Sequence, residues 1–398
     1  AEKFSLNEEE LNALLPSGKQ TIFYNRVCWA RTYLTKAGLL EMSRRSYYRI
    51  TERGRQVLAR TPSRIDMKFL QQFPEYIEFR ERDSGQRKPK ESISDTSENT
   101  PEEILVSCGA KHSIFNAIMT LCDEGDEVIL PSPYWVSYPE MVYLAAGTPV
   151  FVETSPHNNF KLTPAQLKQH INKRTKLLIL NSPSNPTGSV YTEQELREIG
   201  QLCLENNIFI ISDEIYEKLI YDGCRHFSLA SIDKKVRELT LTVNGVSKAY
   251  AMTGWRIGYL GATKEIAQAI SRLQDHTTSC PTSISQKAAC TALRQGEEFT
   301  KKMCEEFKKR RDYAIKRLDN MGKLDYIWPQ GAFYIFCCIK YTGLLSDDFS
   351  HRLLEEAGVS VIPGSGFGRS DYIRISFATG MKEIEKGMDR LEKWLEKL

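Results

Sequence analysis

N-G-V-S-K-A-Y-A-M-T-G-W-R-I-G, residues 244–258, is the most informative segment of this 398-residue chain. It places the amine of Lys248 beside the hydroxyl of Ser247 and a few positions before the guanidinium of Arg256, among small residues that leave the amine uncrowded. An amine can form a Schiff base with a carbonyl compound, while a hydroxyl and a guanidinium can hold a phosphate. The segment therefore predicts a site for a phosphorylated carbonyl ligand, with an ordinary loop of solvated side chains as the alternative.

Upstream of this segment, from about residue 102, short apolar runs alternate with helical patterns, which is typical of an α/β domain with a mostly parallel sheet. Five runs are each followed by a polar cluster: 104–107, 127–130, 177–180, 208–212 and 240–243. Ligands of open parallel sheets bind beyond the carboxyl ends of the strands, so the clusters are predicted to share one site. Downstream, a long charged helix over 299–321 leads into an α+β unit that ends in an amphipathic helix over 382–398.

Residues 1–82 form a predicted unit of their own, followed by a polar linker over 83–101. The unit is predicted to contain helices and a hairpin: a helix beginning at Ser5, a second ending before Gly38, a hairpin over 39–50 and a third helix capped by Thr51. This is the outline of a winged helix. The window 12–60 carries ten basic residues against two acidic ones, which suits contact with DNA phosphates. A packing or dimerisation module is the alternative.

The composition of the whole chain argues against a disulfide-linked, zinc-binding, secreted or membrane-spanning protein. A formal net charge of +3 is too small to indicate a partner. The ten cysteines are scattered without disulfide or zinc spacing, which favours free thiols in a reducing compartment and no metal site. The N-terminus has no apolar signal core, and no apolar run is long enough to cross a membrane, so a cytoplasmic protein is expected.

The segment S-K-A-Y-A-M-T-G-W-R-I-G resembles the cofactor-lysine signature of the class I/II aminotransferases, a pyridoxal-phosphate family of fold type I. N-P-T-G (185–188), S-D-E-I-Y-E (212–217) and P-Y-W-V-S-Y-P-E (133–140) are similar to phrases of the same family. The resemblance implies a cofactor-binding large domain over 102–296, an α+β small domain over 297–398, pyridoxal phosphate and a homodimer. N-R-x-x-W-A-R-x-Y-L-x-x-A-G-L-L (25–40) and Y-R-I-T-E-R-G-R (48–55) resemble the N-terminal domain of Mrr-type restriction proteins.

Pyridoxal phosphate needs a phosphate site, and the start of a helix after a strand can provide backbone N–H groups for it. Gly109, Ala110 and Lys111 occupy such a position, and Ser247 and Arg256 can complete the site. In some aspartate-type relatives a lysine at the place of Lys111 meets the distal carboxylate of acidic substrates. A lysine that faces solvent is the alternative.

The cofactor ring sets further requirements. Asp213 is predicted to keep the pyridine nitrogen protonated, so that the ring can act as an electron sink. Asn185 and Tyr216 are predicted to donate to the ring oxygen, and Trp135 to cover the ring face. Lys248 is predicted to bind the cofactor covalently and to move the substrate proton. Each residue alone has a structural explanation, such as a helix N-cap for Asp213 or a core position for Trp135.

The resemblance also assigns Arg374, in Y-I-R-I-S, to the substrate α-carboxylate, with Asn185 and Trp135 beside it. The predicted function is transfer of an amino group between an amino acid, acidic by preference, and a 2-oxo acid. The family's substrate-closing phrase of the type G-E-P-D-F has no counterpart, and neither has the phrase that sends a tyrosine to the partner's phosphate site. A regulator of the MocR type and a recombined product of unrelated halves are the alternatives.

Overall fold

The computed structural model describes residues 22–44, 47–60, 62, 65–77 and 100–398. The chain divides into two compact units, Ala1–Thr96 and Ser97–Leu398, which are described separately. The start of the helix predicted at Ser5 and residues 83–99 of the linker predicted over 83–101 lie outside the described residues. No helix in the described part is long and apolar enough to cross a membrane. The division of the second unit at residue 296 stays a prediction.

The described residues of the first unit include α2 (Ile22–Lys36), β1 (Leu40–Arg44), β2 (Tyr47–Ile50), α3 (Glu52–Ala59) and α4 (Met67–Leu70). The predicted helix, hairpin and capped helix are confirmed, because β1 and β2 pair antiparallel and the Thr51 side chain accepts the N–H of Gly54 over 3.0 Å. Leu39, Val57 and Tyr76 lie in a small buried core. The assignment as a winged helix stays a prediction.

The second unit is built on a seven-stranded sheet in the order β3-β9-β8-β7-β6-β4-β5. The strands are β3 (Ile104–Ser107), β4 (Glu127–Ser132), β5 (Thr148–Glu153), β6 (Thr175–Asn181), β7 (Phe209–Asp213), β8 (Thr240–Gly245) and β9 (Gly258–Gly261). All pairs among β4 to β8 are parallel, while β9 runs antiparallel to both of its neighbours. The prediction of a mostly parallel sheet is confirmed, and β5 and β9 are the strands that it missed.

Helices cover both faces of this sheet, which explains why its strands are continuous apolar runs. One face packs on α6 (Ala110–Leu121), α7 (Ser137–Leu144) and α11 (Lys264–Thr277), and the other on α8 (Pro164–His170), α9 (Glu193–Glu205) and α10 (Lys234–Leu239). Along β6, Leu177 and Ile179 lie in the first of these cores, and Leu178 and Leu180 lie in the second.

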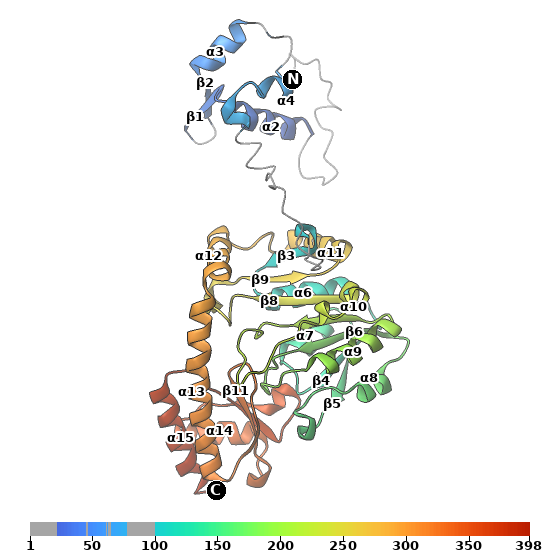
Figure 1. Ribbon diagram of the computed structural model, residues 1–398, viewed down its shortest axis with the longest axis vertical. Helices are drawn as coiled ribbons and strands as arrows, with labels where there is room; N and C mark the ends of the chain where they lie inside the picture. The colour runs from blue at the N-terminus through green and yellow to red at the C-terminus, as the bar shows by residue number, and fades with distance from the viewer. Residues whose placement is uncertain (1–21, 45–46, 61, 63–64, 78–99) are drawn as a thin grey trace. The chain divides into compact units, whose positions relative to one another are not determined.

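A smaller antiparallel sheet follows, in the order β10-β11-β13-β12. Its strands are β10 (Asp325–Ile327), β11 (Tyr334–Cys338), β12 (Ile362–Pro363) and β13 (Tyr372–Ser376). The helices of this part of the chain are α12 (Ser283–Gln295), α13 (Glu297–Met321), α14 (Ser346–Ala357) and α15 (Met381–Leu395). In Figure 1, α13 runs from α12 beside the large sheet down to α14 and α15. Leu219 and Tyr221, which follow β7, share a buried core with this sheet, so the two sheets are packed into one unit.

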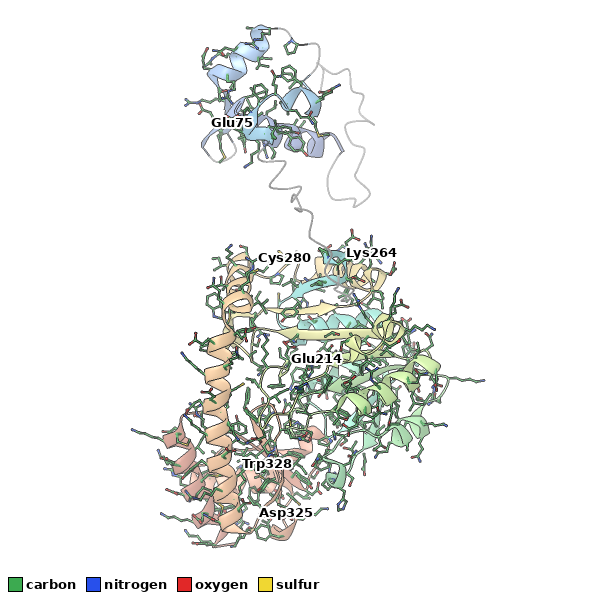
Figure 2. All side chains as sticks on the ribbon, viewed as in Figure 1. Glu75, Glu214, Lys264, Cys280, Asp325 and Trp328 are labelled. Carbon is green, nitrogen blue, oxygen red and sulfur yellow. The ribbon has the colours of Figure 1, made fainter. Side chains whose placement is uncertain are left out.

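Arg311 of α13 strengthens this connection from a fully buried position. Its guanidinium bonds both carboxylate oxygens of Asp222, at 2.6 and 3.0 Å, and the backbone oxygen of Pro329 at 2.9 Å. It also lies 4.9 Å from the ring centroid of Trp328, which is labelled beside α13 in Figure 2. A buried cation with this many partners fixes the long helix against the loop after β7.

Candidate functional site

The strand ends of the large sheet surround a cavity of about 350 Å³. Its lining contains most residues that the sequence analysis selected: Ala110, Lys111, Trp135, Asn185, Asp213, Tyr216, Ser247, Lys248, Arg256 and Arg374. Gly109 is the selected residue that does not line the cavity; it packs against Arg256 instead. Asn181, Thr253 and Tyr334 line the cavity without having been selected. Residues far apart in sequence thus meet in one place.

The start of α6 forms one end of the cavity. Gly109, the residue before the helix, has a φ of +104°, and a Cβ there would overlap the guanidinium of Arg256. Arg256 donates from Nη2 to Cys108 O over 3.2 Å and from Nη1 to Thr253 O over 2.7 Å. His112 and Ser113 donate their N–H groups to Gly109 O, which leaves those of Ala110 and Lys111 at the start of the helix without an acceptor within it. A cation beside these N–H groups suits a phosphate.

Asp213 ends β7 at the floor of the cavity and is buried. Its Oδ2 accepts a hydrogen bond from Tyr138 Oη over 2.7 Å, and its Oδ1 accepts the N–H of Ile215 over 3.2 Å. Burial raises the pKa of Asp213 to about 6, and the bond from Tyr138 opposes this rise. A buried carboxylate with few donors is suited to a cationic partner such as a protonated pyridine nitrogen.

Lys248 lies partly buried in the turn after β8. Burial lowers the pKa of its ammonium, Arg374 and Arg256 lower it further, and Asp213 opposes them. Its Nζ lies 5.7 Å from the ring centroid of Tyr216 and 5.4 Å from that of Phe333. A lowered pKa increases the fraction of neutral amine, which is the nucleophilic form that reacts with carbonyl groups.

Arg374 reaches the cavity from β13 of the small sheet. Its Nη1 donates to Asn185 Oδ1 over 2.7 Å, and its guanidinium lies 4.2 Å from the ring centroid of Tyr334. Its Nε is buried and has no hydrogen-bond partner among the described residues. An unpaired edge of a guanidinium is a ready donor pair for a carboxylate.

Two tyrosines and two asparagines support these groups. The hydroxyls of Tyr216 and Tyr334 lie 2.9 Å apart. Asn181 donates from Nδ2 to Asp213 O over 2.9 Å and accepts the N–H of Asn185 at its Oδ1 over 2.7 Å. Asn181 thus ties the loop that carries Asn185 to the end of β7.

Trp135 and Lys111 lie together on one side of the cavity. The Lys111 Nζ is 4.8 Å from the ring centroid of Trp135, and Trp135 packs edge-on against Tyr138 at 5.3 Å. This contact keeps a positive charge near the cavity although Lys111 is exposed. The structure therefore places Lys111 at the cavity in addition to Arg374, Arg256 and Lys248.

The described residues fit pyridoxal phosphate at its phosphate, at its carbonyl carbon and at its ring nitrogen. The start of α6 with Arg256 and Ser247 would hold the phosphate, Lys248 the carbonyl carbon, and Asp213 the ring nitrogen. The close approach of the Arg256 guanidinium to Gly109 and the unpaired Nε of Arg374 are observations that this fit explains.

A second polar cluster lies next to the cavity, where Glu214, Glu217 and His226 bring three ligand atoms within 4.8 Å. Glu214, labelled in Figure 2, accepts from Ser212 at 2.8 Å, Ser228 at 2.9 Å and His226 at 2.9 Å. These bonds satisfy the carboxylate without a metal ion.

Tyr138 and Tyr334 are functional candidates that the sequence analysis did not select. Tyr138 follows Trp135 by three residues, and its N–H donates to Trp135 O over 3.0 Å in the turn that leads into α7, so this spacing was an available signal. Tyr334 comes from β11 and carries no sequence signal that links it to Tyr216.

Comparison with known proteins adds independent findings. The family aminotransferase class I and II matches residues 73–391, and the Mrr N-terminal domain matches residues 1–60. An aspartate aminotransferase of Geobacillus stearothermophilus is 46% identical over 301 residues, 74% of this chain and 77% of that protein. An aromatic aminotransferase from Pyrococcus horikoshii OT3 superposes with a TM-score of 0.73 at 42% identity, covering 75% of this chain and 81% of the other. A Thermus thermophilus aspartate aminotransferase with maleate gives 0.70 at 41%, covering 74% and 76%.

Proposed function

The chain belongs to the class I and II aminotransferases, whose cofactor is pyridoxal phosphate, and from this we propose that it transfers amino groups between an acidic amino acid, such as aspartate, and a 2-oxo acid. The matched relatives are enzymes, so they give no support to the transcription-regulator alternative. Binding of DNA by the first unit, a homodimer and a cytoplasmic location stay predictions.

The residues of the cavity divide the work in this proposal. When bound, pyridoxal phosphate supplies a carbonyl group and a ring that takes up electrons from the substrate's Cα. The neutral Nζ of Lys248 holds the carbonyl carbon and, once released, carries a proton to and from Cα. Asp213 keeps its negative charge opposite the ring nitrogen, and Tyr138 holds this carboxylate in place.

The preference for an acidic substrate rests on one observation: Arg374 and Lys111 place two cations at the same cavity as Lys248. Arg374 offers its unpaired Nε edge to the α-carboxylate. Lys111, held at the ring of Trp135, offers its ammonium to the distal carboxylate. Maleate, a dicarboxylate, is named with the similar Thermus enzyme, which supports a site with two cations.

The test compares Lys111→Met with the wild type on aspartate and on phenylalanine, in a coupled transamination assay with the full chain. We expect KM for aspartate to rise about tenfold, since one charge-assisted hydrogen bond contributes roughly 1.5–3 kcal/mol, while KM for phenylalanine changes little. Lys302→Met, which changes an exposed lysine of α13, is the matched control. Equal effects on both substrates would refute the role of Lys111.

A further inference from the structure

The loop that begins α6 is held by a histidine that the mechanism above does not use. The backbone N–H of Cys108 donates to His112 Nδ1 over 3.2 Å. On the other side of the same residue, Arg256 Nη2 donates to Cys108 O over 3.2 Å. Ser107 Oγ donates to the next carbonyl, Gly109 O, over 3.0 Å. The backbone directly before the free N–H groups of α6 is therefore fixed by side chains, and one of them is titratable.

This geometry requires a neutral imidazole with its proton on Nε2. Nδ1 accepts a hydrogen bond from Cys108, so it cannot carry a proton. His112 Nε2 lies 3.0 Å from the side-chain amide of Asn116, which is fully buried. Asn116 Oδ1 has no partner among the described residues when the amide nitrogen faces the imidazole. Exchanging the amide oxygen and nitrogen gives Oδ1 the donor that a proton on Nε2 provides, in place of the longer 3.5 Å bond from Nδ2 to Gln274 Oε1.

The surroundings of His112 offer no compensation for a positive charge. Burial lowers the pKa of His112, and no charged neighbour contributes to this shift. The cation in contact with the loop, Arg256, bonds Cys108 O instead of the imidazole. From α11, Gln274 faces Asn116 at 3.5 Å with its uncharged amide, and Asp275 and His276, the titratable residues after it, are exposed.

The other side chains around the loop also provide no negative charge that would stabilise a protonated His112. Ser107 of β3 and Ser113 of α6 bond each other at 2.6 Å and carry no charge. Lys111, the remaining cation at the start of α6, is directed to the ring of Trp135. A second proton on His112 would place two donors face to face, at Nδ1 and at the Cys108 N–H, and the bond between them would be lost.

We propose that neutral His112 is a positioning residue for the phosphate end of the cofactor, and that acid which protonates its imidazole releases the loop 108–111 and weakens cofactor binding. The proposal rests on the proposed function, because it assumes that the phosphate lies at the start of α6. An imidazole that must stay neutral loses its role as the pH falls below the ordinary histidine value of about 6.5, and cofactor affinity falls with it.

The experiment measures equilibrium binding of pyridoxal phosphate and of pyridoxal, which lacks the phosphate, to the cofactor-free full chain at about pH 8 and about pH 5.5. His112→Gln keeps an acceptor for Cys108 and a donor for Asn116 but does not titrate in this range. His112→Ala removes both bonds. The phosphate's second ionisation near pH 6 and that of Asp213 are common to all three proteins, so the difference between wild type and His112→Gln isolates the imidazole.

We expect acid to weaken pyridoxal phosphate binding about fivefold more in the wild type than in His112→Gln, which is the loss of about one hydrogen bond. His112→Ala should bind it weakly at both pH values, and pyridoxal should show none of these differences. The same pH dependence in wild type and His112→Gln, or the same difference with pyridoxal, would overturn the role of His112 alone. Failure of the wild type to bind pyridoxal phosphate at about pH 8 would overturn the cofactor site itself.

Discussion

Tyr138→Phe tests how the protein controls the charge of Asp213. The substitution removes the 2.7 Å hydrogen bond to Asp213 Oδ2 and keeps the aromatic ring in its buried place. A hydrogen bond to a charged acceptor contributes about 1.5–3 kcal/mol, and 1.36 kcal/mol corresponds to about one pKa unit. Without this bond the pKa of Asp213, about 6 in the native protein, should rise by about one to two units.

The sign of the effect on stability follows from the same shift. Burial raises the pKa of Asp213 from 3.8 to about 6, so the folded protein binds more protons than the unfolded chain between these values. Stability therefore falls as the pH rises through this interval, and the ionised carboxylate costs the fold about 3 kcal/mol at neutral pH. Tyr138→Phe increases this cost at neutral pH and changes stability less at pH values well below 3.8, where the carboxyl group is neutral in both states.

The measurement is an NMR titration of the cofactor-free full chain labelled with carbon-13 at the aspartate carboxyl groups, with Asp213→Asn to identify the signal. Tyr143→Phe is the matched control, since Tyr143 lies exposed on the same helix α7. An unchanged or lower pKa of Asp213 in Tyr138→Phe would refute the conclusion that this hydrogen bond stabilises the carboxylate.

Three further predictions concern other parts of the site. Arg374→Lys keeps the charge but loses the planar donor pair, so kcat/KM for aspartate should fall about 100-fold in the steady-state assay, mostly through KM. Gly109→Ala should weaken binding of pyridoxal phosphate at least about tenfold in a spectroscopic titration, because a Cβ at φ +104° overlaps Arg256. Arg311→Met should destabilise the second unit by about 3 kcal/mol in urea unfolding followed by a fluorophore attached to that unit, since Asp222 loses its buried partner.

Matched variants control each of these three predictions. Arg390→Lys changes an arginine of α15 that donates to Gly358 O and does not line the cavity, so it should leave kcat/KM unchanged. Gly387→Ala introduces a methyl group where nothing lies within 4 Å, so it should leave cofactor binding unchanged. Arg310→Met changes the residue next to Arg311. Arg310 pairs with Glu306, whose side chain is more exposed than that of Asp222, so this change should lower the free energy of unfolding by less than about 1 kcal/mol. An effect of the control as large as that of its partner would contradict the corresponding prediction.

The sequence was sufficient for the parts of the fold that local patterns determine. Apolar runs predicted five of the seven strands of the large sheet, and polar residues after them, such as Asp213 and Lys248, were predicted to share one edge because parallel strands end on the same side. The short strand β9 was not predicted, because its four residues include two glycines and its antiparallel pairing depends on residues far along the chain. Propensity over so short a segment carries little information.

The side-chain contacts that hold the site residues in place could not be predicted from the sequence, for a different physical reason. Tyr138 acts on Asp213, and Tyr334 acts on Tyr216, through side-chain pairs that only the packing of separate elements brings together. Periodicity places a residue on a face of a helix or strand, but it does not say which residue from another element lies opposite. His112 is the clearest case, because its role depends on which of its two nitrogens accepts a bond.

The two sheets contribute unequally to the site, and this follows from where their strands end. The residues proposed for the cofactor, among them Asp213, Lys248 and Arg256, come from the strand ends of the large sheet and the loops beside them. Arg374 comes from β13 of the small sheet, and its bond to Asn185 joins the two groups across the cavity. A substrate carboxylate at Arg374 would bind the guanidinium edge that this bond leaves open, so it would share the guanidinium with Asn185 at the contact between the sheets. Cofactor affinity and substrate affinity should therefore respond to different residues, with Asn185 as the position where a change affects both.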